Sequence, residues 1–207
     1  MKWLDSLLNT EPTPITDLDK VKVIPNEFPL VQDLDIKRIY TLINPNFDHG
    51  PWICGGSVRK LYQKQKLNGS DIDIWTVDDQ QMQDLKLKFD RLAKTGSRLT
   101  TDHAITYKID DCKIQLIKHH FANYQEVIDD FDFTICQITT DGYQFKYNNT
   151  TISDINNKRL RLANSIRHDT IASRLLKYVV YGFKPDQQLL DDLLDQQDKI
   201  IWKGYAY

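Results

Sequence analysis

The hydrophobic and polar positions along the chain follow two periods, one typical of helices and one typical of strands. Ile36, Ile39, Tyr40 and Ile43 are spaced for one face of a helix, whereas the residues from 71 to 77 alternate as a strand does. The same reasoning along the chain predicts helices over residues 31–43, 57–66, 79–93, 123–129, 169–182 and 186–201. It predicts strands over residues 51–54, 71–77, 103–109, 112–118, 133–138 and 143–147.

The order of these elements predicts the organisation of the chain. Residues 1–30 hold four of the seven prolines and little periodicity, which indicates a short helix followed by an extended arm. We expect residues 1–45 to form an N-terminal arm and helix packed on a head of residues 46–150. Residues 151–207 are expected to form a short helical neck. The fold class is therefore α+β, with a mixed sheet of about five strands flanked by helices.

Candidate chemistry gathers in two neighbouring stretches. The run from Gly55 to Arg59 is a glycine turn that leads into a helix, where Ser57 can act as N-cap. Such a helix start presents backbone N–H groups to an anion. Asp71 and Asp73 follow in a strand, where residues two apart share a face. Because two adjacent carboxylates repel unless a cation lies between them, the pattern indicates a site for a metal-bound phosphate.

Composition and charge narrow the class of protein. The chain is 41% hydrophobic and 27% charged with a net charge of −2, which is ordinary for a soluble globular protein and gives no general signal for binding polyanions. Cys54, Cys112 and Cys136 lack a pairing pattern, so we expect reduced, buried thiols. The sequence shows no membrane-spanning run and no signal-peptide pattern, and a cytoplasmic location is the expectation. Nothing in it indicates an oligomeric state.

The order of the motifs resembles the nucleotidyltransferase superfamily that includes DNA polymerase beta, poly(A) polymerases and CCA-adding enzymes. The resemblance is greatest to the head and neck of bacterial-type tRNA nucleotidyltransferases and poly(A) polymerases. It covers roughly residues 50–184. The segment from Cys54 to Leu61 is like the G-G-x-V-R-D opening of these enzymes, and the segment from Ser70 to Ile74 is like their D-x-D strand. Further along, Asp132 to Cys136 is like the D-F-T-I-N segment, and Arg174 to Lys177 with Tyr181 to Phe183 is like the neck helix.

The resemblance implies metal-dependent transfer of a nucleoside monophosphate from an NTP to an acceptor hydroxyl. Asp71 and Asp73 would be the catalytic residues and would hold Mg²⁺ or Mn²⁺. The nucleotide would be bound by Gly55, Gly56, Ser57, Arg59, Asp132 and Arg174. For Arg59, an exposed surface arginine is an equally weighted alternative. An RNA 3′ end is the favoured acceptor, and a protein or a small molecule remains an alternative.

The sequence also departs from the superfamily. Gln115 stands where a third acid is expected; an amide can coordinate a metal but brings no charge and cannot act as a base. Asp130 and Phe131 replace two arginines that precede Asp132 in the relatives, and no acid is in register in the neck. A second hypothesis is therefore a catalytically weakened head that binds nucleotide or RNA. A purely structural role is the third alternative.

Overall fold

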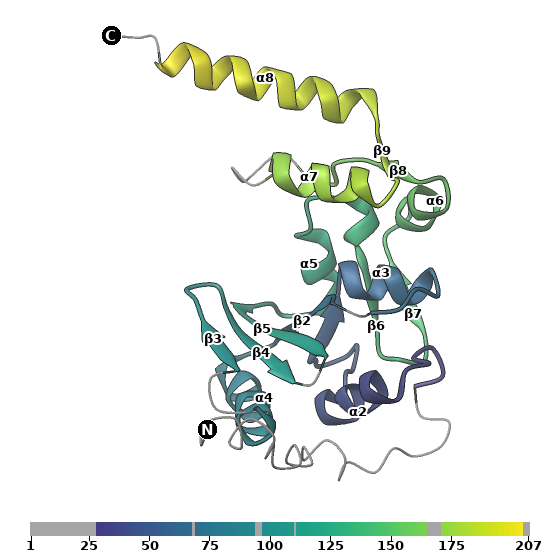
Figure 1. The fold of residues 1–207 in the computed structure, drawn as a ribbon, viewed down its shortest axis with the longest axis vertical. Coiled ribbons are helices and arrows are strands. Elements are labelled where there is room, and N and C mark those ends of the chain that lie inside the picture. The colour runs from purple at the N-terminus through teal and green to yellow at the C-terminus, as the bar shows by residue number, and fades with distance from the viewer. Residues whose placement is uncertain (1–27, 68, 94–96, 110, 165–170, 205–207) are drawn as a thin grey trace, which may run out of the picture.

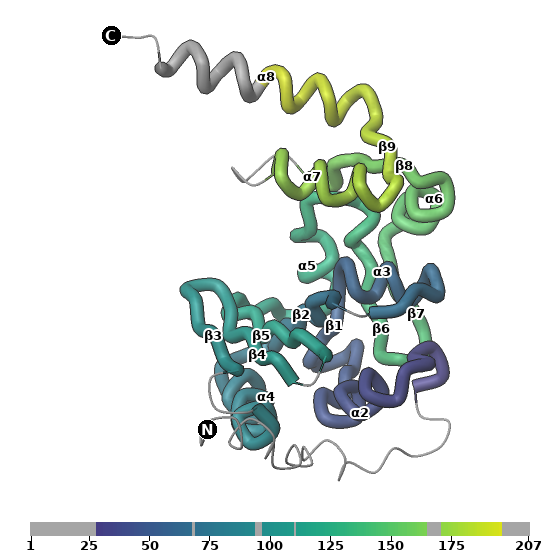
Figure 2. Tube along the Cα trace, in the orientation of Figure 1, coloured from purple at the N-terminus to yellow at the C-terminus, as the bar shows by residue number. Residues whose placement is uncertain are grey.

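The computed structural model describes residues 28–67, 69–93, 97–109, 111–164 and 171–204, the last nine of these by their backbone alone (Figures 1 and 2). The predicted arm before Phe28 and the expected helix start at Asp169 lie outside the described residues. Within those residues, no helix combines the length and the apolar character that are needed to cross a membrane.

A mixed seven-stranded sheet forms the centre of the described chain, with the order β3-β4-β5-β2-β1-β6-β7. β2 and β5 are parallel, and the other neighbouring pairs are antiparallel. The α+β prediction is confirmed, although the sheet has more strands than the expected five or so. The strands are β1 (Trp52–Cys54), β2 (Asp71–Thr76), β3 (Arg98–Thr100), β4 (Ala104–Ile109), β5 (Cys112–His120), β6 (Ile138–Thr140) and β7 (Phe145–Tyr147).

The helices follow their caps and apolar faces. One predicted helix cap and one predicted strand are corrected. The described helices are α2 (Leu34–Ile43), α3 (Gly56–Tyr62), α4 (Asp79–Leu92), α5 (Tyr124–Asp129), α6 (Thr151–Asn156), α7 (Ile171–Val180) and α8 (Gln187–Gly204). Asp33 caps α2 by accepting hydrogen bonds from the N–H groups of Asp35 and Ile36. Ser57 does not cap α3, because that helix begins earlier, after Gly55. The predicted strand over 133–138 is instead a 3₁₀ turn, η2 (Thr134–Cys136), followed by β6.

The two faces of the sheet differ in the side chains that they carry. Ile72 and Ile74 of β2 pack against Val58 of α3, Ile39 of α2 and Phe89 of α4 in the largest buried cluster. Figure 1 shows α2 and α4 on one side of the sheet, with α5 and α7 on the other. The side chains that alternate with the isoleucines, Asp71 and Asp73, therefore face the side of α5 and α7.

A smaller apolar cluster joins the end of the sheet to the C-terminal part. Phe133 and Ile135 pack with Tyr178 of α7 and with Phe183. Two short parallel strands, β8 (Arg159–Leu160) and β9 (Lys184–Pro185), pair with each other just before α8 begins. In Figure 1, α8 extends away from the body of the molecule. The domain boundaries after residues 45 and 150 stay predictions.

Cysteine burial follows the expectation in part. None of Cys54, Cys112 and Cys136 forms a disulfide, and the first and third are buried. Cys112 is only half-buried; it is the first residue of β5 and pairs with Ile109 next to the turn of the β4–β5 hairpin. Cys136 lies in η2 rather than in a strand.

The turn before α3 gives a test of the fold at the site. Gly55 has φ of +84°, and a Cβ there would lie 2.8 Å from the ring of Phe131. We expect Gly55→Ala to lower the free energy of unfolding by about 2 kcal/mol, because it combines backbone strain with a clash.

Gly56→Ala is the matched control, since a Cβ at Gly56 meets nothing within 4 Å. It is expected to change stability by less than about 1 kcal/mol. Chemical denaturation of both variants measures the difference, and equal stabilities would contradict the role assigned to Gly55.

Candidate nucleotide and metal site

Asp71 and Asp73 lie side by side on β2, next to β5. In the parallel ladder Asp71 pairs with Lys113 and Asp73 pairs with Gln115. On the other side of β2, Asp73 pairs with Cys54, the last residue of β1 before the glycine turn. The strand pairing therefore brings the two acids, the turn and the predicted third position together, as the sequence motifs require.

Asp73 is the more deeply placed of the two acids. Its Oδ1 atom is buried and has no hydrogen-bond partner among the described residues. Burial, and after it the negative charge of Asp71, raises the pKa of Asp73 to about 7, against the opposing charges of Lys177, Arg174 and Lys113. A buried carboxylate oxygen without a donor is suited to a cation. This pair therefore fits a divalent metal.

No group of three or more His, Cys, Asp or Glu residues in the described part of the chain is placed to hold a metal ion. Gln115 is an amide, and its nitrogen donates to the Thr106 hydroxyl at 3.3 Å. A cation between Asp71 and Asp73 would take its other ligands from water and from a phosphate. Mg²⁺ is commonly bound in this way, by one or two carboxylates together with substrate phosphates.

A cavity of about 150 Å³ opens between the start of α3, the acids and α7. Ser57 contributes a buried hydroxyl that has no hydrogen-bond partner among the described residues. Lys60 lies at the same cavity and donates to the Ser70 hydroxyl at 2.6 Å. The other lining residues include Gly56, Asp71, Asp73, Arg174 and Lys177. This mixture of donors, cations and two acids suits a metal-bound anion.

The glycine turn contributes less than expected. The N–H of Gly55 donates to the carbonyl of Ile138 at 2.9 Å, so it is not available to a phosphate. This corrects the prediction that all three residues of the turn present N–H groups. Gly55 instead supplies the backbone conformation that places Gly56 and Ser57 at the edge of the cavity.

Arg59 is buried rather than exposed at the surface, and its predicted contact with a phosphate stays a prediction. Only 2% of its surface is exposed, so it is not a surface arginine. Its guanidinium lies 5.0 Å from the ring centre of Phe183, 5.5 Å from Tyr178 and 5.8 Å from Tyr181. It also donates to the side chain of Gln63 at 3.2 Å. Arg59 lines the small cavity, but its contacts here join α3 to α7 rather than reaching toward the acids.

Asp132 and Arg174, both predicted to contact the nucleotide, form an ion pair at 2.8 Å. They line a larger cavity of about 650 Å³, which Asp73 also lines. Trp75 and Phe131 meet edge to face at 5.4 Å in its wall. Asp73 lines both cavities and therefore lies where the two meet.

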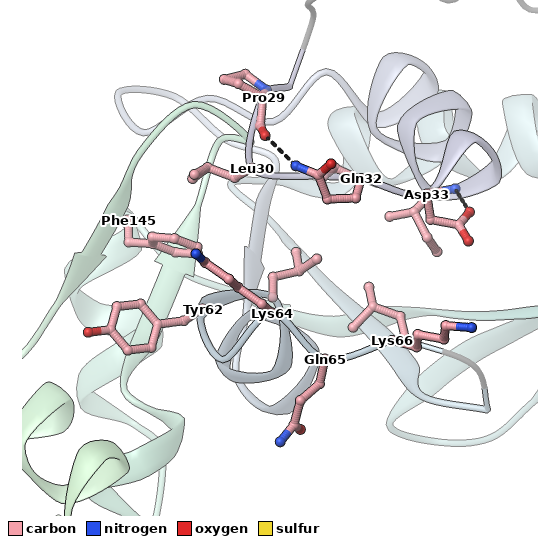
Figure 3. Close-up of a pocket in the computed structure, with 13 residues that line it drawn as sticks. Pro29, Leu30, Gln32, Asp33, Tyr62, Lys64, Gln65, Lys66 and Phe145 are labelled. Atoms are coloured by element: carbon pink, nitrogen blue, oxygen red, sulfur yellow. Dashed lines mark hydrogen bonds between the residues drawn. The ribbon is translucent and has the colours of Figure 1, made fainter.

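A further cavity of the described chain lies away from these residues. It measures about 690 Å³ and is formed by the segment before α2, the end of α3 and Phe145 (Figure 3). Tyr62, Lys64 and Lys66 project from the α3 side in this view. None of the residues predicted to act in the site lines it. The site is therefore defined by its chemistry and not by the size of a cavity.

Comparisons with known proteins give the family and the fold of the chain. The sequence profile of the Gabija anti-defense 2 family matches residues 31–158. That match spans more than half of the 207 residues. The chain belongs to the Gabija anti-defense 2 family. No curated protein matches its sequence significantly.

Solved structures with a similar fold are CCA-adding enzymes. The Thermotoga maritima enzyme complexed with tRNA aligns with a TM-score of 0.57 and 16% identity, over 79% of this chain and 43% of that enzyme. A CCA-adding enzyme in complex with ATP gives 0.60 and 16%, over 80% and 43%. The Bacillus stearothermophilus enzyme in complex with CTP gives 0.51 and 12%, over 70% and 38%. The Gabija anti-defense 2 chain thus has the nucleotidyltransferase fold and spans less than half the length of these enzymes.

Some residues of the site in this Gabija anti-defense 2 protein were not assigned from the sequence. Lys177 lines the small cavity, and its charge acts on Asp73. Its spacing of three residues from Arg174 on α7 was an available signal, because such residues share a helix face. Phe131 lies against Gly55 and in the wall of the larger cavity, which no local pattern indicates.

The raised pKa of Asp73 predicts how stability depends on pH in the metal-free protein. The pKa of about 7 in the folded state lies above the ordinary value of about 4 in the unfolded chain. The folded state keeps the proton where the unfolded state has lost it, so this carboxyl contributes less stability as pH rises from about 4 to about 7. Above pH 7, Asp73→Asn should be more stable than the wild type by on the order of 2 kcal/mol.

Denaturation curves at several pH values without divalent metal measure this difference. Asp84→Asn, on the exposed face of α4, is the control and should parallel the wild type throughout. If Asp73→Asn also parallels the wild type between pH 4 and 8, the account of Asp73 is wrong.

Proposed function

We propose that this protein binds a nucleoside triphosphate with a divalent cation and transfers the nucleoside monophosphate to an acceptor hydroxyl. The single observation that carries the proposal is the position of Asp73, with a buried carboxylate oxygen that has no hydrogen-bond partner among the described residues, at the junction of two cavities. The smaller cavity has the cations and donors for a triphosphate. The larger one has aromatic walls of a size suited to a base and sugar.

Each part of the site has a role in this proposal. Asp71 and Asp73 would hold Mg²⁺ or Mn²⁺, which would supply positive charge to stabilise the charge that develops at the α-phosphate. Ser57 and Lys177 would donate to the phosphates, where their contacts are charge-assisted. Asp132, held by Arg174, would orient the sugar. The acceptor oxygen forms the new bond to the α-phosphorus, pyrophosphate leaves, and the hydroxyl proton passes to solvent.

The favoured acceptor is an RNA 3′ end. It is supported by the fold shared with CCA-adding enzymes, one of which is complexed with tRNA. The name of the family adds a biological setting, since it describes an anti-defense protein directed at Gabija. We infer that the nucleotide chemistry at this site is the means by which the protein counteracts the Gabija defense system. A protein component of the defense system is accordingly the second acceptor to test.

A second candidate function is binding without transfer. Gln115 favours it, because the side chain next to Asp73 on β5 is an amide that brings no negative charge. A head of this kind would hold a nucleotide or an RNA end and act through a partner. Calorimetry with NTP and Mg²⁺ measures binding, and the labelling assay described next measures transfer. Binding by calorimetry without any labelled product supports this second function.

Transfer itself is tested with α-labelled NTPs, Mg²⁺ or Mn²⁺, and either total RNA or the Gabija proteins. We expect label in one acceptor fraction with the wild type. Asp71→Asn with Asp73→Asn should reduce labelling at least about 100-fold while the fold is retained, because the cation loses both charged ligands.

Asp84→Asn removes an acid from the exposed face of α4 and is the control for loss of a carboxylate outside the site. It should label at the wild-type rate. Label incorporated equally by the double variant and the wild type would show that the chemistry lies elsewhere. A folded wild type that neither binds NTP nor transfers label would contradict both candidate functions.

A further inference from the structure

Four side chains of β2 and β5 form a compact square on the face of the sheet that carries the site. β2 supplies Asp71 and Asp73, and β5 supplies Lys113 and Gln115 directly beside them in register. Residues paired in a ladder lie about 5 Å apart and share a face. The formal charges of the square are therefore two negative and one positive.

Lys113 already forms an ion pair with one of the two acids, Asp71. Its Nζ atom lies 2.9 Å from Oδ1 of Asp71, with side-chain exposures of 48% for the lysine and 36% for the acid. The ammonium group thus makes the contact with Asp71 that a bound cation would make. Because the pair is partly exposed, this contact is weak enough to exchange.

Gln115 does not restore the missing charge. Its amide nitrogen is engaged with Thr106 of β4, and its remaining oxygen is a neutral acceptor. A divalent ion entering the square would therefore meet two carboxylates, one of them already neutralised by Lys113.

We propose that Lys113 is a built-in competitor for the metal at Asp71, so that the nucleotide-free protein binds divalent ions weakly. The triphosphate would relieve this competition by offering its own negative charge to the lysine and its oxygens to the metal. Metal and nucleotide are then taken up together. This inference rests on the proposed cation site at Asp71 and Asp73. It adds that Lys113, on the neighbouring strand β5, controls when a cation binds there.

Electrostatics sets the expected size of the effect. A divalent ion about 5 to 6 Å from an ammonium group in a partly exposed site is repelled enough to weaken its binding about tenfold. The repulsion is screened by salt, because both groups are accessible to solvent. A purely structural role of Lys113 would not give a salt-dependent change in metal affinity.

The experiment measures Mn²⁺ binding to the nucleotide-free, full-length protein by electron paramagnetic resonance. Lys113→Met should bind Mn²⁺ about tenfold more tightly than the wild type at low salt, and the gain should shrink at high salt. Lys113→Arg retains the charge and should remain weak. Lys88→Met changes the net charge equally on exposed α4 and should leave affinity unchanged.

Gln115→Glu is a second, independent variant, since it adds the absent acid without touching Lys113. It should also raise Mn²⁺ affinity, and a thermal melt of each variant confirms that it is folded.

Two results would overturn the inference in distinguishable ways. If Lys113→Met binds Mn²⁺ no more tightly than the wild type, while Asp71→Asn abolishes that binding, the metal site stands and the competition by Lys113 is wrong. If no folded variant binds Mn²⁺ with or without NTP, the cation site of the proposed function fails together with the inference.

Discussion

The balance of charge around Asp71 and Asp73 is the constraint on which the rest of the site depends. Two carboxylates share one face of a strand, and Asp73 is buried deeply enough that its pKa rises to about 7. The cations that oppose this come from two elements, with Lys113 on β5 and Arg174 and Lys177 on α7. Because attraction between charges falls with distance, the acids are stabilised only where both elements are closely packed against β2. The docking of α7 is therefore an electrostatic requirement of the site as well as a packing arrangement.

Arg59 explains how that docking is fixed. Its side chain projects from α3 about one turn after the glycine pair, and the rings of Tyr178, Tyr181 and Phe183 surround its guanidinium. A guanidinium over aromatic faces is attracted by their quadrupoles, and desolvation strengthens that attraction. Tyr178 lies one helical turn beyond Arg174. The same contact that buries Arg59 thus sets the position of Arg174 on the edge of the cavity, and the helix after the glycine turn is tied to the helix that supplies the cations.

Much of the fold was predictable because its signals are local. Helices α2 and α4 carry apolar residues on one face, and β2 alternates strictly, so each was found close to its observed bounds. β3 was missed because all three of its residues are exposed and carry no alternation. In the site, the shared face of Asp71 and Asp73 followed from the alternation of β2, whereas the ion pair between Asp132 and Arg174 was not predicted. The engaged N–H of Gly55 and the buried setting of Arg59 were not predicted either, since each depends on a partner far away in the sequence.

The division of labour between the two faces of β2 and β5 bears on how this fold can change its function. Ile72 and Ile74 with Ile114 and Leu116 fill the core on one face and fix the register of the two strands. The opposite face carries the charges. A one-residue slip would exchange the faces, so the core holds the acids in place whatever stands beside them on β5. Side chains such as Gln115 are therefore free to vary without cost to the fold. Similarity to CCA-adding enzymes, at 16% identity or less in these alignments, is therefore a similarity of fold, and the charges of β5 are where this chain can differ in function.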